Sequence, residues 1–152
     1  MEKFNFNFNQ LKVHQLGLVF KDIEAQGKIL QDLYGLTPFA FYPIEKFPTI
    51  YKGNESFLSG KLGFSQLGET QYELIEWSEG DCPYKDFLDQ GQEGFHHIGI
   101  RLPDIDPYIA EFKKRGIEVL FTSRSDLAKF AYLETEKTFG MIVELIQRRT
   151  TQ

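Results

Sequence analysis

The chain contains two copies of one sequence pattern, and this duplication limits the folds that it can adopt. The segment QLGLVFKDI at 15–23 is similar to HIGIRLPDI at 97–105, which lies 82 positions later. The tripeptide Glu-Leu-Ile occurs at 73–75 and again at 144–146, which is 71 positions later. The second copy is therefore 11 residues shorter (82 − 71). We expect the extra residues of the first copy to form a long loop over 42–56, where proline and glycine occur.

Each copy predicts the same order of elements, which is one strand, one helix and three further strands. The first copy predicts a strand over 13–20, a helix over 22–35 and strands over 39–43, 57–66 and 71–77. The second copy predicts a strand over 96–102, a helix over 106–116 and strands over 118–122, 129–134 and 141–147. A short helix is expected over 84–90. The sequence therefore predicts an α+β fold of two βαβββ modules, 11–78 and 94–149, joined by a linker over 78–94.

Length and composition favour one globular unit over residues 1–152, with an N-terminal extension over 1–10. A hydrophobic fraction of 41% provides a core, and a net charge of −5 argues against nucleic-acid binding. No apolar run approaches the roughly 18 residues that span a bilayer, so no membrane partner is expected. The N-terminus lacks the apolar segment of a secretory signal. The single cysteine, Cys82, fits a reducing compartment, and we expect a cytoplasmic protein.

The segment GFHHIGIRL at 94–102 places two histidines side by side in a predicted strand. Because side chains on a strand alternate between its faces, His96 and His97 are expected to point to opposite sides. His97 shares its face with Gly99 and Arg101, and strand glycines allow the close approach of a ligand or another backbone. The face of His96 is otherwise apolar and is expected to pack on the helix. His97 is therefore expected to face a cavity.

The repeat extends this assignment to the first copy. Gln15 corresponds to His97, and His14 corresponds to His96. Gln15 is therefore expected to face the same cavity from the equivalent strand position, and all three histidines lie in this duplicated strand.

Two glutamates occupy equivalent positions at the far end of the modules. Glu73 and Glu144 each lie inside an apolar strand, where a carboxylate is costly unless it is paired, bound to a metal or at an edge. One cation between the modules would stabilise both. An amide oxygen, two carboxylates and one imidazole suit a divalent metal such as Zn, Ni, Co or Mn. Surface ion pairs of the two glutamates are the alternative.

The sequence resembles the vicinal oxygen chelate superfamily from about residue 13 to residue 147. The matching pieces are HQLGLVFKDIEA, GLTPF, QYELIEW, GFHHIGIRLPDID, FAYLET and GMIVELIQ. The resemblance implies a cup-shaped mixed sheet of the glyoxalase/bleomycin resistance type, with a metal in the cup. Within the superfamily, the chain is most similar to glyoxalase I-like proteins and methylmalonyl-CoA epimerases.

The resemblance also implies four metal ligands from the first and last strands of each module. They fall on Gln15, Glu73, His97 and Glu144, which match the Gln, Glu, His, Glu set of zinc-type glyoxalase I in residue type and chain order. Many relatives have His where this chain has Gln15. His14, one position earlier, is the alternative first ligand, and strand periodicity favours Gln15.

The function implied by the resemblance is that of a lactoylglutathione lyase, in which a metal stabilises an enediolate and Glu144 moves the proton, with Glu73 opposite it. The substrate would be a small-molecule hemithioacetal or thioester. A methylmalonyl-CoA epimerase-like enzyme is the alternative enzymatic function. The non-enzymatic alternatives are a metal-free antibiotic-binding protein and a metal-binding sensor. Extradiol dioxygenases use two histidines and one carboxylate, which this ligand set does not supply.

Several side chains have supporting roles in this hypothesis. His96 and His14 are expected to orient ligands by hydrogen bonding. Arg101 either binds a substrate carboxylate or phosphate or pairs with a surface acid. By analogy with relatives we expect a homodimer. Six further residues are candidates for the lining of the cup: Phe39, Phe41, Tyr42, Glu45, Phe64 and Tyr132.

Overall fold

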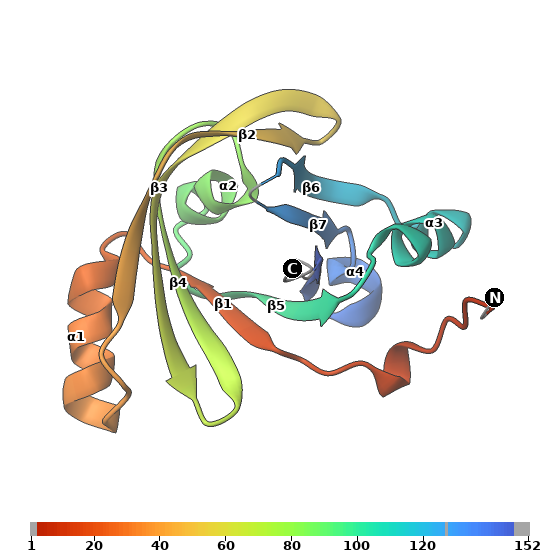
Figure 1. Ribbon diagram of the computed structural model, residues 1–152. Helices are drawn as coiled ribbons and strands as arrows, with labels where there is room; N and C mark the ends of the chain where they lie inside the picture. Colours follow the sequence, from red (N-terminus) through yellow and green to blue (C-terminus); the bar gives the residue numbers. More distant parts are fainter. Residues whose placement is uncertain (1–2, 127, 148–152) are drawn as a thin grey trace.

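The computed structural model of the chain describes residues 3–126 and 128–147. Within these residues, eight strands form one sheet that closes into a barrel (Figure 1). The strands are β1 (Gln15–Val19), β2 (Ala40–Tyr51), β3 (Asn54–Leu67), β4 (Thr70–Glu79), β5 (Gly94–Leu102), β6 (Val119–Arg124), β7 (Lys129–Leu133) and β8 (Ile142–Gln147). The helices are α1 (Ile23–Tyr34), α2 (Pro83–Asp89), α3 (Asp106–Lys114), α4 (Glu136–Phe139) and the 3-10 helix η1 (Phe8–Gln10).

Each half of the barrel is one copy of the duplicated pattern. The first half has the spatial order β1-β4-β3-β2, and the second half has the equivalent order β5-β8-β7-β6. In each half, the first and last strands are parallel neighbours and the other neighbours are antiparallel. The predicted α+β fold of two βαβββ modules is therefore confirmed. The predicted end of the second module, residues 148–149, lies outside the described residues.

Two antiparallel junctions join the modules. β1 pairs with β5 along its whole length. β2 pairs with β6 only near its end, where Ile50 lies opposite Thr122 and Tyr51 lies opposite Phe121. The short second junction closes the expected cup into a ring.

The helix of the first module begins and ends where the sequence predicts. The Asp22 side chain accepts a hydrogen bond from the backbone N–H of Ala25, and Gly35 adopts a left-handed conformation with φ of 69°. α1 lies on the outside of the barrel against β3 and β4 (Figure 1). α3, which has proline in its first turn, packs through Phe112 on the second module.

The expected loop over 42–56 is wrong, because β2 and β3 form a long hairpin there. Its turn is Lys52–Gly53, and both residues have positive φ, as in a type I′ hairpin turn. Pro43 and Pro48 lie within β2. A strand tolerates proline where its second edge is unpaired, and β2 pairs with β6 only at Ile50 and Tyr51. The prolines therefore mark an open strand edge.

Three groups of buried apolar side chains form the core. One lies beneath α1 around Ile23 and Leu74, and a second lies beneath α3 around Ile105 and Leu145. The third brings Tyr84 of α2 against strands of both modules. No helix in the described part of the chain is long and apolar enough to cross a bilayer.

The described part of the N-terminal extension covers α3. Phe4 makes an edge-to-face contact with Tyr108, and Phe6 and Phe8 make edge-to-face contacts with Phe112. Such contacts add to the burial of the aromatic rings. The extension is therefore tied to the second module by alternate phenylalanines.

Candidate metal centre

The pairing of β1 with β5 brings the two copies of the duplicated strand together. Leu16 lies opposite Ile98, and these two residues are equivalent in the repeat. An antiparallel pair centred on equivalent residues has an approximate two-fold axis at its centre. Equivalent side chains of the two modules therefore converge around this point within a single chain.

Each first-strand candidate ligand lies opposite a glycine of the other module. His97 lies opposite Gly17, and Gln15 lies opposite Gly99. A Cβ atom on Gly17 would lie 2.0 Å from Cε1 of His97, so the imidazole occupies the space that a side chain would need. A Cβ atom on Gly99 would lie 2.9 Å from Oε1 of Gln15. The absence of a side chain at these two glycines thus makes room for the side chains of His97 and Gln15.

The two glutamates lie on the other side of these glycines. Glu73 of β4 pairs with Gly17, and Glu144 of β8 pairs with Gly99. Each carboxylate therefore faces, across a glycine, the first-strand residue of the other module.

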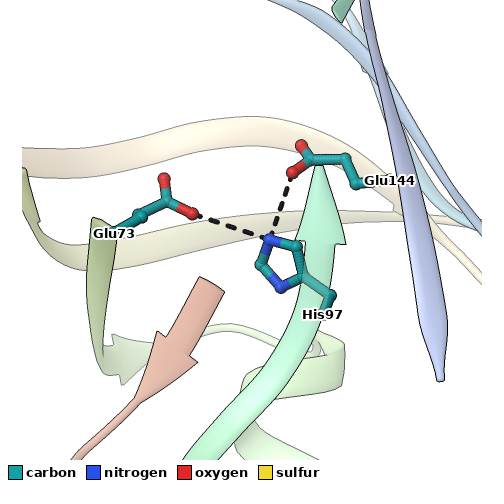
Figure 2. Close-up of side chains that lie close together, drawn as sticks. All are labelled: Glu73, His97 and Glu144. Carbon is teal, nitrogen blue, oxygen red and sulfur yellow. Dashed lines mark ion pairs between the residues drawn. The ribbon is translucent and has the colours of Figure 1, made fainter. Parts of the chain in front are cut away.

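Glu73, His97 and Glu144 point toward one another (Figure 2). Nε2 of His97 lies 3.6 Å from Oε1 of Glu73 and 3.2 Å from Oε1 of Glu144. His97 is fully buried, and each glutamate is 8% exposed. One ligand atom from each residue lies within 4.8 Å of the other two, a spacing suited to a single metal ion. The structure thus gathers three of the four predicted ligands into one compact group.

The charges of this group are strongly coupled. Burial lowers the pKa of His97, but the hydrogen bonds and charges of Glu144 and Glu73 outweigh burial and raise this pKa to about 9. Burial raises the pKa of Glu144, which the neighbouring His97 opposes. The imidazolium form of His97 therefore offsets the carboxylate charge, and a divalent cation on the same side chains would offset it in the same way.

Gln15 is the fourth predicted ligand. Its side chain is buried, and its Nε2 donates a hydrogen bond of 2.8 Å to Oε1 of Gln71. Its Oε1 is buried without a hydrogen-bond partner in the described structure, and Gln15 lines the same cavity as Glu73 and Glu144. A buried amide oxygen without a partner is costly, and a cation would satisfy it. The three oxygen ligands and one nitrogen ligand therefore fit a divalent metal.

His96 and His97 do not point to opposite sides, and that expectation is wrong. Gly17 and Leu18 pair with His97 and Phe95, so His96 is the extra residue of a β-bulge. The bulge brings the two Nδ1 atoms to 3.0 Å from each other. Burial and the charge of His97 lower the pKa of His96 to about 3, so His96 is neutral and can accept the Nδ1–H of His97. When Nε2 of His97 gives up its proton to a cation, this hydrogen bond keeps the remaining proton on Nδ1 and leaves the Nε2 lone pair toward the carboxylates.

His14 and Arg101 lie beside the group. Nδ1 of His14 accepts a hydrogen bond of 3.1 Å from the backbone N–H of Arg101, and its ring is outside the group of three. This placement favours Gln15 over His14 as the first ligand. The guanidinium of Arg101 donates a hydrogen bond of 2.9 Å from Nη2 to Oε1 of Gln71, and Arg101 is not among the residues that line the cavity. Its contact with a substrate remains a prediction.

A cavity of about 790 Å³ opens onto the group. Gln15, Glu73 and Glu144 are among its polar lining residues. Its apolar walls come mainly from the hairpin of the first module and from β7: Ile44, Phe47, Leu58, Leu62, Phe64 and Phe130. Arg124, Asp126 and Lys129 also line it. This combination suits a small molecule with an apolar part and a polar reactive end.

Two tyrosines line the cavity next to His97. The hydroxyl of Tyr132 lies 3.3 Å from Nε2 of His97, and it contacts the hydroxyl of Tyr84. Burial raises the pKa of both tyrosines well above the usual value, so both hydroxyls stay protonated and can donate hydrogen bonds.

Sequence reasoning missed Tyr84 because it lies in the linker helix, where no repeat or strand alternation marks it. Of the six residues expected to line the cup, Phe64 and Tyr132 do so. The others do not line it, because Phe39 and Phe41 pack beneath α1 while Tyr42 and Glu45 are exposed.

Comparison with known families agrees with this architecture. Residues 14–132 match the profile of the Glyoxalase/Bleomycin resistance protein/Dioxygenase superfamily. The chain therefore belongs to this superfamily, and the predicted vicinal oxygen chelate fold is confirmed. No curated protein sequence matches the chain.

Several solved structures share the fold along almost the whole chain. A hypothetical protein from Bacillus halodurans is 21% identical with a TM-score of 0.67, and the match covers 94% of this chain and 98% of that one. A variant of methylmalonyl-CoA epimerase from Streptomyces coelicolor, in complex with 2-nitronate-propionyl-CoA, is 19% identical with a TM-score of 0.72, covering 92% and 99%. Methylmalonyl-CoA epimerase from Mycobacterium tuberculosis is 14% identical with a TM-score of 0.65, covering 91% and 88%. At these identities the likeness shows a shared fold.

Proposed function

We propose that the protein is a metal-dependent enzyme of the glyoxalase I type, which moves a proton between carbons next to a carbonyl group. The observation that supports this proposal is the buried set of Gln15, Glu73, His97 and Glu144 beside a cavity. Neighbouring buried carboxylates need a counter-charge, and the partnerless oxygen of Gln15 needs a donor or a cation.

Gln15, Glu73, His97 and Glu144 would hold one divalent cation, of Zn, Ni, Co or Mn. Such a cation supplies Lewis acidity toward an oxygen of a carbonyl compound in the cavity. Two carboxylates and two neutral ligands leave the site without net charge when a divalent ion is bound. The four side chains would leave the cavity side of the cation open to the oxygen of the substrate.

Glu144, Glu73 and Tyr132 then have separate roles in the proton transfer. Glu144 lines the cavity, and its carboxylate is the base toward a carbon acid bound there. It takes the proton from one carbon and returns it to the next. Glu73 occupies the equivalent place in the other module. The protonated hydroxyl of Tyr132 donates a hydrogen bond to the substrate oxygen that gains charge.

An epimerase that acts on a thioester of coenzyme A is the second candidate. The observation in its favour is the shared fold with methylmalonyl-CoA epimerases, with TM-scores up to 0.72. Glu73 and Glu144 both line the cavity, and proton exchange on both faces of one carbon requires two such carboxylates. The glyoxalase type ranks first because glutamine occupies the first ligand position, as in zinc-type glyoxalase I.

The proposal is tested by removing bound metal and refilling the protein separately with Zn²⁺, Ni²⁺, Co²⁺ and Mn²⁺. We expect about one equivalent of at least one cation per chain, because the donor set describes a single site. Each refilled sample is then given a glutathione hemithioacetal and methylmalonyl-CoA in heavy water, and deuterium at the reacting carbon is measured. Failure to retain any of the four cations would contradict the enzyme proposal and favour a metal-free binding protein.

Metal affinity is expected to rise with pH. Below about pH 9 the imidazolium is the main form of His97, so cation binding must displace a proton. The apparent affinity should therefore increase about tenfold per pH unit from pH 7 to pH 9 and level off above. Competition titrations with a chelator of known proton affinity measure this slope. An affinity that is independent of pH in this range would show that Nε2 of His97 is not a ligand.

A further inference from the structure

The side-chain amide of Gln15 can bind a cation in only one of its two orientations. Rotation by a half turn exchanges Oε1 for Nε2, and only the oxygen can bind a cation. In the structure, Nε2 points to Gln71 and Oε1 is the buried atom without a partner. Some neighbouring group must favour this orientation.

The identity of the contacting atoms follows from the chemistry of Arg101. A guanidinium has donors and no acceptor, so the Gln71 atom at 2.9 Å from Nη2 of Arg101 must be the oxygen. The same Oε1 of Gln71 lies 2.8 Å from Gln15, so Gln15 must offer its nitrogen. The amide oxygen of Gln15 is then the atom left without a hydrogen-bond partner in the described structure. This conclusion follows from the donor and acceptor chemistry of the three side chains.

We propose that Gln71 and Arg101 are positioning residues that hold the oxygen of Gln15 toward the cation. The inference rests on the proposed function, because it assumes a cation at this site. It changes the expected role of Arg101 from binding the substrate to orienting a ligand through Gln71.

The second module uses a different device for its first-strand ligand. The repeat places Ile142 at the position of Gln71 and Val19 at the position of Arg101, and neither can form such a hydrogen bond. His97 instead contacts Nδ1 of His96 from the bulge. An amide needs an acceptor to fix its orientation, whereas an imidazole needs a partner to fix its tautomer.

The inference is tested by two substitutions at Gln71 and one at Arg101. Gln71→Leu removes the acceptor, and we expect cation affinity to fall about 10- to 100-fold. Gln71→Glu retains an acceptor oxygen for Gln15 and Arg101. The cation affinity of this variant should stay within about threefold of the wild type. Arg101→Met lets the amide of Gln71 rotate, and its affinity should fall between these values. Zn²⁺ affinity is measured by competition, and the visible spectrum of bound Co²⁺ reports the ligand set.

Gln66→Leu is the matched control, since exposed Gln66 lies opposite Gln71 on the neighbouring strand. It should bind cations like the wild type. In a Gln15→Ala background, Gln71→Leu should cause no further loss, because the ligand that it positions is absent. Thermal unfolding of the metal-free variants shows that each one folds.

The outcomes separate this inference from the proposed function. A wild-type protein that binds no cation overturns both. A wild type that binds, together with a Gln71→Leu variant of equal affinity and unchanged Co²⁺ spectrum, overturns the positioning role alone. A loss of cation affinity in Gln71→Glu as large as that in Gln71→Leu also overturns the positioning role, because the missing hydrogen-bond acceptor would then not explain the loss.

Discussion

Glu144→Gln is expected to lower the rate of proton transfer by about 10²–10⁴-fold on whichever substrate the protein accepts. Glutamine keeps the size of the side chain and an oxygen that can face the cation. It lacks the carboxylate that takes up the proton, and its amide is not a base. The loss should therefore appear mainly in kcat, with a smaller change in bound metal.

The measurement is deuterium exchange at the reacting carbon together with steady-state turnover, at equal cation content. Glu134→Gln is the matched control, because Glu134 is exposed at the end of β7 and the variant carries the same change of charge. It should retain the wild-type rate. A Glu144→Gln variant that works within about tenfold of the wild type would remove Glu144 from the role of base.

His97→Ala is expected to abolish cation binding, with a loss of affinity of at least about 100-fold. The variant removes the single nitrogen donor of the candidate set and leaves Glu73 and Glu144 without the imidazolium that contacts both. Breaking a buried ion pair in this way costs roughly 3–5 kcal/mol. The metal-free variant should therefore also be less stable to unfolding at neutral pH than the metal-free wild type.

Cation content after refilling and denaturant unfolding check these two expectations. His14→Ala is the control, because the ring of His14 lies outside the group of candidate ligands. It should still bind the cation. Full metal content in His97→Ala, or a loss in His14→Ala as large as that in His97→Ala, would contradict the assigned ligand set.

The repeat made much of the fold predictable. Matching 15–23 with 97–105 predicted two modules with the same order of elements, and the structure has that order. The ends of α1 followed from Asp22 and Gly35, whose preferences are local. Equivalence between the copies also pointed to Gln15, Glu73, His97 and Glu144, because duplicated polar residues in apolar strands need a shared explanation.

Some features depended on which strand pairs with which. Residues 42–56 of the β2–β3 hairpin were expected to form a loop, because proline usually breaks strands and nothing in a sequence marks an open edge. The orientation of His96 was wrong for a related reason. Strict alternation assumes regular pairing, and the bulge exists only because β5 has one residue more than β1 over the paired stretch.

The sequence alone therefore determined the module, its duplication and the chemical types of the four candidate ligands, since these follow from local periodicity and from comparing the chain with itself. The tertiary structure decided how the ligands meet. Pairing of β1 with β5 places Gln15 and His97 each opposite a glycine of the other module. Gln71 and Arg101 set the orientation of the Gln15 amide. These arrangements join residues far apart in the chain, and hydrogen-bond geometry between strands leaves no periodic trace in the sequence.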